Sequence, residues 1–238
     1  MKQQILSPSS ATVWSRAQCD FTECVEPGGK TSVSWRGAEW ILRFKDASVN
    51  EVIGYQVAEF LSLPVQPWLA VEVGQIEDTG IEKPNLGLLV QKWDQKSDGC
   101  SVDFPAASHP MLAGTALALS CFIPQDMEWM RDATSTELRL IDLEDCGPLL
   151  MLLDPNEWNY LVDVYLNCVR TNFWCCYKIA IPVKSFFCSA LARLVEADLM
   201  GIVSFSGHSR ANEITAKAAS FLKLAQKILS DFSSGLVL

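Results

Sequence analysis

The chain of 238 residues is 49% hydrophobic and carries a formal net charge of −9. This length and hydrophobicity suffice for one large core or two small lobes, which excludes a disordered protein. Its 28 acidic residues outnumber 19 basic ones, which excludes a general nucleic-acid-binding protein, because such a protein needs a basic face.

Membrane insertion and export are not indicated either. No apolar run approaches the roughly 20 residues that span a bilayer, and the polar residues 1–12 lack the layout of a signal peptide. The nine cysteines are an odd number, and neither His109 nor His208 stands near the closely spaced Cys19 and Cys24, so disulfides and a zinc site are disfavoured. We therefore expect a cytoplasmic protein with buried free thiols and no membrane span.

The first motif along the chain is the turn Gly28-Gly29-Lys30. Glycine amides and a lysine can bind phosphate, but the P-loop pattern needs a glycine at the position of Cys24. Two interpretations stay open: a glycine-containing β-hairpin that covers a nucleotide, and an ordinary hairpin turn.

The next two strands, over residues 32–35 and 39–44, are expected to pair around a turn at Arg36-Gly37. In the second strand, apolar residues alternate with a set that includes Arg43, so one face is apolar and the other cationic. A helix follows, with Asn50 as its N-cap and its end set by Pro64.

Arg43 and Glu51 place a strand cation shortly before a helix carboxylate. In a kinase N-lobe, such a cation neutralises nucleotide phosphate and the helix carboxylate holds it in place. On this interpretation Arg43 binds phosphate and Glu51 anchors Arg43. Two simpler interpretations stay open: Arg43 as a solvated strand residue, and Glu51 as a carboxylate favoured by the helix dipole.

Two further strands are expected at residues 65–73 and 86–93, on either side of a loop. The second of these strands ends in Gln91, Lys92 and Trp93. In a kinase this is where the sheet meets the interlobe hinge, whose backbone binds adenine, so these three residues are candidates for nucleotide binding. The polar, turn-rich residues 94–110 mark the expected lobe boundary.

After this boundary the chain is expected to be mainly helical. An apolar helix is predicted at residues 113–122, then a loop at 125–131 and a strand at 138–142. The chain then continues in three predicted helices, over residues 155–174, 182–199 and 211–232.

The order of these motifs resembles that of the HipA-like kinase family. The family's K-F strand, N-E helix and L-P-V-P turn correspond to Arg43-Phe44, Asn50-Glu51 and residues 61–67. Its catalytic loop and I-D strand correspond to residues 125–131 and 138–142. The resemblance covers residues 28–148 and implies the two-lobed fold of that family.

The resemblance also implies an ATP- and Mg²⁺-dependent kinase that phosphorylates a hydroxyl group of a protein or small molecule. Asp126 matches the aspartate that accepts the acceptor's proton or positions it, and Asp142 matches the metal-binding aspartate. This sequence departs from the family at Arg43, which replaces a lysine. It departs again at Arg131, because a cation cannot replace the asparagine expected there as the second metal ligand.

The expected fold is therefore α+β with a two-lobed, kinase-like architecture. A small β-rich N-lobe takes residues 1–95, and a helical C-lobe takes residues 96–238, with a catalytic-loop-like segment at 124–148. Three functions stay open: an active kinase with a protein or small-molecule substrate, a pseudokinase that binds a nucleotide or a regulatory protein partner, and an unrelated α+β interaction protein.

Overall fold

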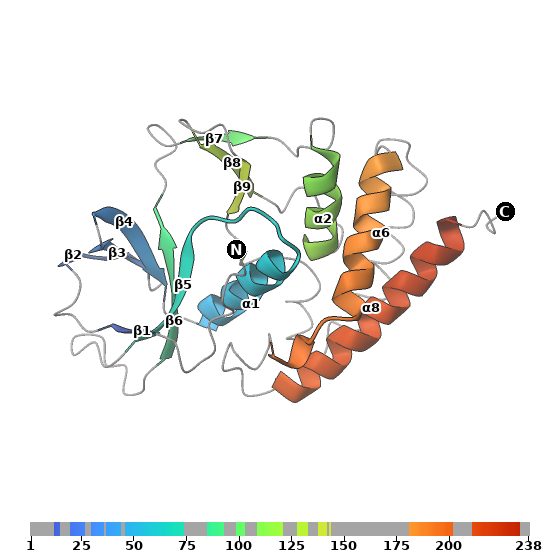
Figure 1. The fold of residues 1–238 in the computed structure, drawn as a ribbon. Helices are drawn as coiled ribbons and strands as arrows, with labels where there is room; N and C mark the ends of the chain where they lie inside the picture. The colour runs from blue at the N-terminus through green and yellow to red at the C-terminus, as the bar shows by residue number, and fades with distance from the viewer. Residues whose placement is uncertain are drawn as a thin grey trace.

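The computed structural model of the chain describes residues 12–14, 20–26, 30–35, 37–43, 46–73, 85–92, 99–102, 109–120, 128–132, 138–141, 143, 181–201 and 211–233. These residues form an α+β fold in which helices pack beside two β-sheets (Figure 1). The described elements, in chain order, are β1 (Thr12–Trp14), β2 (Asp20–Glu26), β3 (Lys30–Trp35), β4 (Ala38–Arg43), α1 (Asp46–Phe60), β5 (Trp68–Val73), β6 (Asn85–Gln91), β7 (Gly99–Val102), α2 (Pro110–Ser120), β8 (Glu128–Asp132), β9 (Leu138–Ile141), α6 (Ile181–Val195) and α8 (Ala211–Ser233).

The larger sheet has six strands in the order β1-β5-β6-β4-β3-β2. Its strands pair antiparallel, except that β1 runs parallel to β5. The predicted hairpin is confirmed, because β3 and β4 pair from Lys30 opposite Arg43 to Trp35 opposite Ala38. Gly37 in the connecting turn has a φ of 76°, a backbone conformation that glycine adopts without steric cost.

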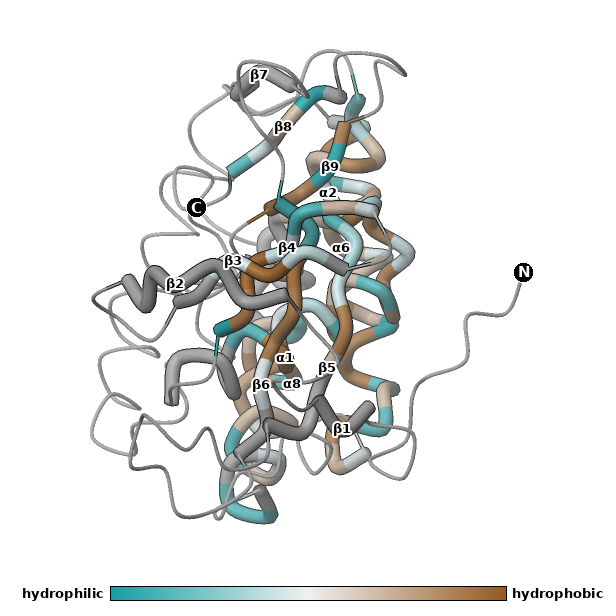
Figure 2. Tube along the Cα trace, turned by 90° about the vertical axis from the view of Figure 1, so that its left-hand side faces the viewer, coloured by the Kyte–Doolittle hydropathy of each residue, from teal (hydrophilic) through white to brown (hydrophobic). Residues whose placement is uncertain are grey.

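The two faces of β4 differ as the alternation predicts, and within the strand only Glu39 is exposed. Trp40 and Leu42 are buried on one face. On the other, Ile41 packs against the main core beneath α1, and Arg43 shares that face because side chains alternate along a strand. The apolar strands of the sheet are visible in Figure 2. Arg43 is therefore not the solvated strand residue that the sequence left as an alternative.

Helix α1 begins at Asp46, four residues before the predicted N-cap Asn50. Aspartate, like asparagine, is favoured at helix N-termini, and the helix starts at this earlier candidate rather than at Asn50. At the other end, Ser62 takes the left-handed conformation, with a φ of 64°. The N–H of Ser62 donates to the carbonyl oxygen of Glu59 at 2.9 Å, and the N–H of Leu63 donates to that of Ala58 at 2.9 Å. This pair of hydrogen bonds is a Schellman motif, which ends the helix just before Pro64.

The smaller sheet has three antiparallel strands in the order β7-β8-β9. Strand β9 confirms the prediction over residues 138–141. The predicted loop at 125–131 is wrong from Glu128 onward, because β8 pairs with strands on both of its sides and buries Trp129 and Met130. Strand β7 lies inside the segment predicted to be an irregular boundary.

The two sheets are joined where the segment after α1 meets β9. Val65 forms a parallel bridge with Leu140. The N–H of Leu140 donates to the carbonyl oxygen of Pro64 at 2.8 Å, and its carbonyl oxygen accepts from the N–H of Gln66 at 3.1 Å. This junction lies between the strands of the small sheet and α1 in Figure 1.

Helices α2 and α6 approach each other closely because α2 is built from small residues. At Gly114 an added Cβ would clash with the carbonyl oxygen of Val183 and would lie 2.8 Å from Cβ of Phe186. Helix α6 ends at Val195 and is followed by a turn, so the predicted single helix to residue 199 is too long. Helix α8 confirms the prediction to within one residue.

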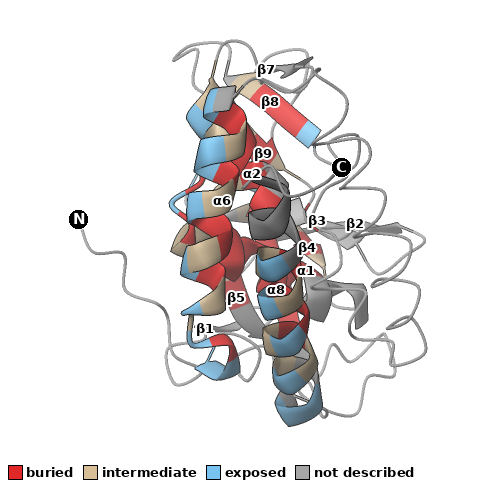
Figure 3. Ribbon diagram, turned by 90° about the vertical axis from the view of Figure 1, so that its right-hand side faces the viewer, coloured by how far each residue is buried: buried red, intermediate tan, exposed pale blue. Residues whose placement is uncertain are grey.

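One hydrophobic core joins the sheet to the helices. It takes buried side chains from both sides of the predicted lobe boundary, among them Val52, Tyr55, Leu88, Val90, Trp129, Leu140, Phe187, Leu191, Phe221 and Leu222. Helices α6 and α8 turn their buried sides inward and their exposed sides to water (Figure 3). None of the described helices is both long enough and apolar enough to cross a membrane.

Cys188 is a free thiol on α6, half-buried rather than fully buried. Burial raises the pKa of this thiol, because desolvation disfavours the thiolate. The predicted helix at residues 155–174 lies outside the described residues.

Candidate functional site

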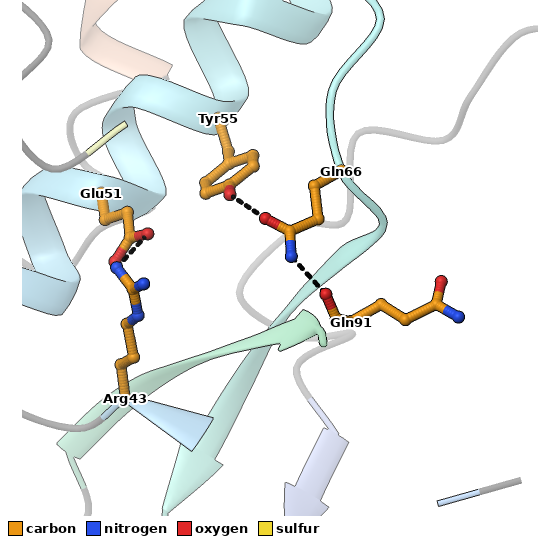
Figure 4. Close-up of polar contacts among 5 residues, drawn as sticks. All are labelled: Arg43, Glu51, Tyr55, Gln66 and Gln91. Atoms are coloured by element: carbon orange, nitrogen blue, oxygen red, sulfur yellow. Dashed lines mark hydrogen bonds and ion pairs between the residues drawn. The ribbon is translucent and has the colours of Figure 1, made fainter. Parts of the chain in front are cut away.

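The candidate site is built around the ion pair between Arg43 and Glu51. Arg43 is the last residue of β4, and Glu51 lies near the start of α1, the helix that covers this face of the sheet. The guanidinium Nη1 of Arg43 lies 2.6 Å from the carboxylate Oε1 of Glu51 (Figure 4). The contact expected from the sequence is therefore present.

Both charges of this pair are largely removed from water. The side chain of Arg43 is 14% exposed and that of Glu51 is 1% exposed. Burying a carboxylate is costly unless a cation and hydrogen bonds compensate for its lost hydration. The helix dipole does not account for Glu51, because α1 begins at Asp46 and Glu51 lies in its second turn, beyond the first turn where the dipole acts most strongly.

Arg43 has chemistry that suits an anionic ligand. A guanidinium presents five N–H donors in a planar fork, so it can bind a carboxylate with one edge and a phosphate with another. An arginine also stays charged when it is buried, unlike a lysine. Glu51 can therefore hold the positive charge of Arg43 in a fixed position at the edge of the core.

Lys30 is placed next to this pair by the strand register. Lys30 lies directly opposite Arg43 in the β3–β4 ladder, and opposite Glu26 in the β2–β3 ladder. Gly28 and Gly29, which precede it, lie outside the described residues. The phosphate-binding role predicted for this turn stays a prediction.

Gln91 and Lys92 lie at the end of β6, as predicted for hinge residues, and their main-chain groups are largely engaged. The N–H of Gln91 donates to the carbonyl oxygen of Pro67 at 2.9 Å, and the N–H of Lys92 donates to that of Glu39 at 2.8 Å. The carbonyl oxygen of Gln91 accepts from Nε2 of Gln66. The nucleotide-binding role predicted for Gln91 and Lys92 stays a prediction, and Trp93, the third hinge candidate, lies outside the described residues.

Gln66 is a site residue that the sequence analysis missed. Its buried side chain accepts a hydrogen bond from the hydroxyl of Tyr55 at 3.2 Å and donates to Gln91, so it connects α1 to the end of β6 (Figure 4). The ring of Tyr55 also stacks on Trp68, with 5.4 Å between centroids. The signal available in the sequence is the position of this glutamine between two prolines. That signal does not predict the partners of its side chain, because they are set by tertiary contacts.

Glu59 is a second carboxylate on α1, and it faces β5. Its Oε1 accepts a hydrogen bond from Nε1 of Trp68 at 2.9 Å. Burial raises the pKa of Glu59, and the hydrogen bond from Trp68 partly opposes that rise.

The chain that follows β9 passes close to α1. An added Cβ at Gly54 would lie 2.8 Å from the carbonyl oxygen of Leu143. Gly54 is three residues beyond Glu51, and residues three apart are neighbours on a helix surface. Leu143, which follows the predicted metal ligand Asp142 in the sequence, therefore lies close to α1.

Asp126 and Asp142 themselves lie outside the described residues, and their catalytic and metal-binding roles stay predictions. Arg131, expected in the catalytic loop, lies instead in β8, where it pairs with Cys100 and Leu138. Among the described residues, no group of three or more metal-binding side chains comes together.

Comparison with known proteins gives little further guidance. No family model matches the chain, and no curated protein matches it. It is similar to the solved structure of a Helicobacter pylori proinflammatory kinase, CtkA, with 11% sequence identity over 90% of this chain and 93% of that chain. The TM-score is 0.39, a value at which the likeness carries no argument about function.

Proposed function

We propose that the chain is an atypical HipA-like kinase that transfers the γ-phosphoryl group of ATP to a hydroxyl group of a protein or small molecule. The observation that carries this proposal is the buried Arg43–Glu51 ion pair, which joins a sheet strand to the helix covering it. The alternative is a pseudokinase, with the same nucleotide site or a protein-binding surface and no transfer.

The position of the pair in the topology supports the proposal. In protein kinases, a lysine on the third strand pairs with a glutamate on the following helix, and the lysine contacts the nucleotide phosphates. Arg43 ends β4, the third strand of the antiparallel run β2-β3-β4, and Glu51 lies on the helix that comes next. Lys30, opposite Arg43, adds a second basic residue at the same end of the hairpin.

The contribution of the buried Arg43–Glu51 pair to stability does not by itself explain its presence. Replacing a buried ion pair by apolar residues of similar size is often neutral or stabilising. The pair is therefore poorly explained by packing alone, and a fixed cation for phosphate gives it a function. In this arrangement Glu51 holds the guanidinium of Arg43 in a fixed orientation at the nucleotide phosphates.

The remaining roles follow the family resemblance. Asp126 would accept the proton from the attacking hydroxyl or orient that hydroxyl. Asp142 would hold Mg²⁺, which neutralises the β- and γ-phosphates when bound. Residues 1–95 would form the nucleotide-binding lobe and residues 96–238 the lobe that carries Asp126 and Asp142.

One observation favours the pseudokinase. Residues 128–132 form the strand β8, and Arg131 stands where the family has its second metal ligand. A cation cannot serve as that ligand. A chain with only Asp142 for the metal would bind a nucleotide with Mg²⁺ but transfer its phosphoryl group slowly or not at all.

The test is ATP binding, measured by calorimetry and by thermal unfolding in the presence of Mg²⁺. A ligand that binds only the folded state stabilises it by about 2.7 kcal/mol at a concentration of 100 Kd. We expect stabilisation of the parent, a large loss in Arg43→Met, and a loss of the Mg²⁺ dependence in Asp142→Ala. Lys223→Met removes an exposed cation from α8 and should behave like the parent.

Transfer is then tested by incubation with labelled ATP and candidate acceptors. Phosphate incorporation that disappears in Asp126→Asn, with ATP binding retained, supports the active kinase. Binding without incorporation supports the pseudokinase. An absence of ATP binding in the parent contradicts the active kinase and leaves a protein-binding pseudokinase or the unrelated α+β interaction protein.

A further inference from the structure

The side chain of Gln66 replaces a hydrogen-bond donor that the large sheet lacks. In the register of β5 and β6, Pro67 falls opposite Gln91, one position before the first pair of the two strands. The N–H of Gln91 donates to the carbonyl oxygen of Pro67 at 2.9 Å. Two residues in this antiparallel arrangement normally exchange two hydrogen bonds, but a proline has no N–H. The second bond comes instead from Nε2 of Gln66, which donates to the carbonyl oxygen of Gln91.

Tyr55 of α1 fixes the orientation of this amide. Its hydroxyl donates to Oε1 of Gln66 at 3.2 Å, so that Nε2 on the other side of the amide faces Gln91 (Figure 4). Tyr55 is fully buried and Gln66 is 8% exposed. An unpaired polar group in such a place costs free energy, so both ends of the amide need these partners. An apolar side chain of similar length would fill the same space but could not hydrogen-bond to both α1 and β6.

Tyr55 lies one helical turn after Glu51 on α1. Residues four apart lie on the same face of a helix, so Tyr55 and Glu51 both face the large sheet. A rotation of α1 that withdraws Glu51 from Arg43 would also withdraw Tyr55 from Gln66. The two contacts therefore form and break together.

The C-terminal end of α1 is held by different contacts. Glu59 accepts a hydrogen bond from Trp68. Arg193 of α6 donates to the carbonyl oxygen of Phe60. Both contacts lie about two turns beyond Glu51, so they constrain its side chain less directly than the contact at Tyr55 does.

The sheet completes the connection between Gln66 and the ion pair. Strand β4, which carries Arg43, pairs with β6, which carries Gln91. The helix is thus linked twice to the same pair of strands, at Glu51 and at Tyr55. Loss of the link at Tyr55 lets α1 turn on the sheet around the other one.

We infer that Gln66 is a positioning residue that holds Glu51 against Arg43 by way of Tyr55 and α1. The consequence for ligand binding rests on the proposed function. With Glu51 in place, the guanidinium of Arg43 stays fixed where it can bind the phosphates of a nucleotide. Without the amide of Gln66 the guanidinium gains freedom, and phosphate binding then has to restore its order at a cost in affinity.

ATP binding with Mg²⁺, measured by calorimetry, tests this role in the variant Gln66→Met. Methionine keeps a side chain of similar length and removes both ends of the amide. We expect the affinity for ATP to fall roughly 5-fold or more, the lower end of coupling between sites. Parent-like affinity in Gln66→Met overturns the inference.

Gln56→Met is the matched control for this variant. Gln56 lies on α1 with the same exposed fraction as Gln66, 8%, and its Oε1 has no hydrogen-bond partner in the described part of the chain. Its replacement removes a buried amide without breaking the connection to β6, so Gln56→Met should bind ATP like the parent. An equal loss of affinity in both variants would show that any buried amide has this effect, and it overturns the inference.

The variant Gln66→Glu separates the hydrogen bonds from the size of the side chain. A protonated carboxyl can accept from Tyr55 and donate to Gln91 as the amide does, whereas a carboxylate has no donor. Its affinity for ATP should match that of the parent at about pH 5 and fall below it as the pH rises to about 9. The parent at the same pH is the reference, because Glu59 and the phosphates of ATP also titrate. A constant ratio to the parent shows that the donor to Gln91 has no effect, and it overturns the inference.

Urea unfolding gives a reading that does not need a ligand. Gln66→Met should destabilise the protein less in a Glu51→Gln background than in the parent, because the ion pair that Gln66 holds is already broken. Equal destabilisation in the two backgrounds means that Gln66 stabilises the fold independently of the pair, and it overturns the inference. If the parent binds no ATP, the proposed kinase activity fails, while this comparison still decides the positioning role.

Discussion

Glu59 of α1 accepts a hydrogen bond of 2.9 Å from the indole nitrogen of Trp68 in β5, and burial raises the pKa of the same carboxyl. The neutral carboxyl is thus easier to accommodate here than the carboxylate, although the indole N–H favours the charged form. The balance makes this contact between helix and sheet sensitive to pH.

The first prediction concerns that sensitivity. Between the usual pKa of 4.5 and the raised value in the folded state, the folded protein keeps a proton that the unfolded chain has lost. The contribution of Glu59 to stability therefore falls as pH rises through this window and stays low above it. Glu59→Gln, which keeps an acceptor for Trp68, should be more stable than the parent at pH 7, with the difference shrinking toward pH 4.5.

Urea unfolding at a series of pH values measures this difference. Glu196→Gln is the matched control, because Glu196 lies exposed in the turn after α6. If Glu59→Gln and the parent have the same free energy of unfolding at every pH, protonation of Glu59 does not affect this contact.

The second prediction concerns the Arg43–Glu51 pair. Glu51→Gln removes one charge and leaves Arg43 mostly buried, so we expect a loss of about 3 kcal/mol in the free energy of unfolding. The double variant Arg43→Met with Glu51→Leu leaves no buried charge and should recover most of this loss, while ATP binding is not recovered. If the double variant is as unstable as the sum of its single changes, the two residues do not act as a pair.

The third prediction concerns Gly54, where α1 lies against Leu143. A Cβ at this position would be 2.8 Å from a main-chain oxygen, which cannot rotate away. Gly54→Ala should therefore cost about 1–2 kcal/mol, even though alanine favours a helix over glycine. In Gly201→Ala the close atom is the carboxylate oxygen of Asp198, the end of a flexible side chain, and that variant should unfold like the parent. Equal stability of the two variants in urea would contradict the close contact.

The fourth prediction concerns the hydroxyl of Tyr55. Tyr55→Phe keeps the stacking on Trp68 and removes a donor to the buried Gln66, which should cost about 1–2 kcal/mol. In a Gln66→Met background the same change should cost much less, because the acceptor is already gone. If urea unfolding shows that Tyr55→Phe lowers the free energy of unfolding equally in both backgrounds, the hydroxyl does not act through Gln66.

The elements that the sequence predicted well are those fixed by local pattern. The β3–β4 hairpin has a glycine at its turn and an alternating second strand, and α8 has a long amphipathic period. Strands β7 and β8 have neither signal: β7 reads Gly-Cys-Ser-Val, and β8 begins and ends with charged residues. They are strands because β8 pairs with β7 on one side and with β9 on the other, and no local window of sequence contains these partners.

The same division applies to the site. Arg43 and Glu51 are eight residues apart, on a strand and the helix directly after it, so their contact was predictable from spacing. Gln66 meets Gln91 across 25 positions, and Arg193 meets Phe60 across 133. Contacts between residues so far apart in the sequence depend on how whole helices and strands pack. Local patterns in a single sequence do not predict that packing.

The bridge between Val65 and Leu140 has a consequence for how the chain reaches its native state. It joins two segments far apart in sequence, so a long loop must close before Leu140 finds its partners, and such closures slow folding. The core also draws on residues from Val52 to Ala225. A fragment that ends near residue 95 would therefore leave the apolar side of α1 without its covering helices, so the two halves of the chain are expected to fold together rather than in turn during synthesis.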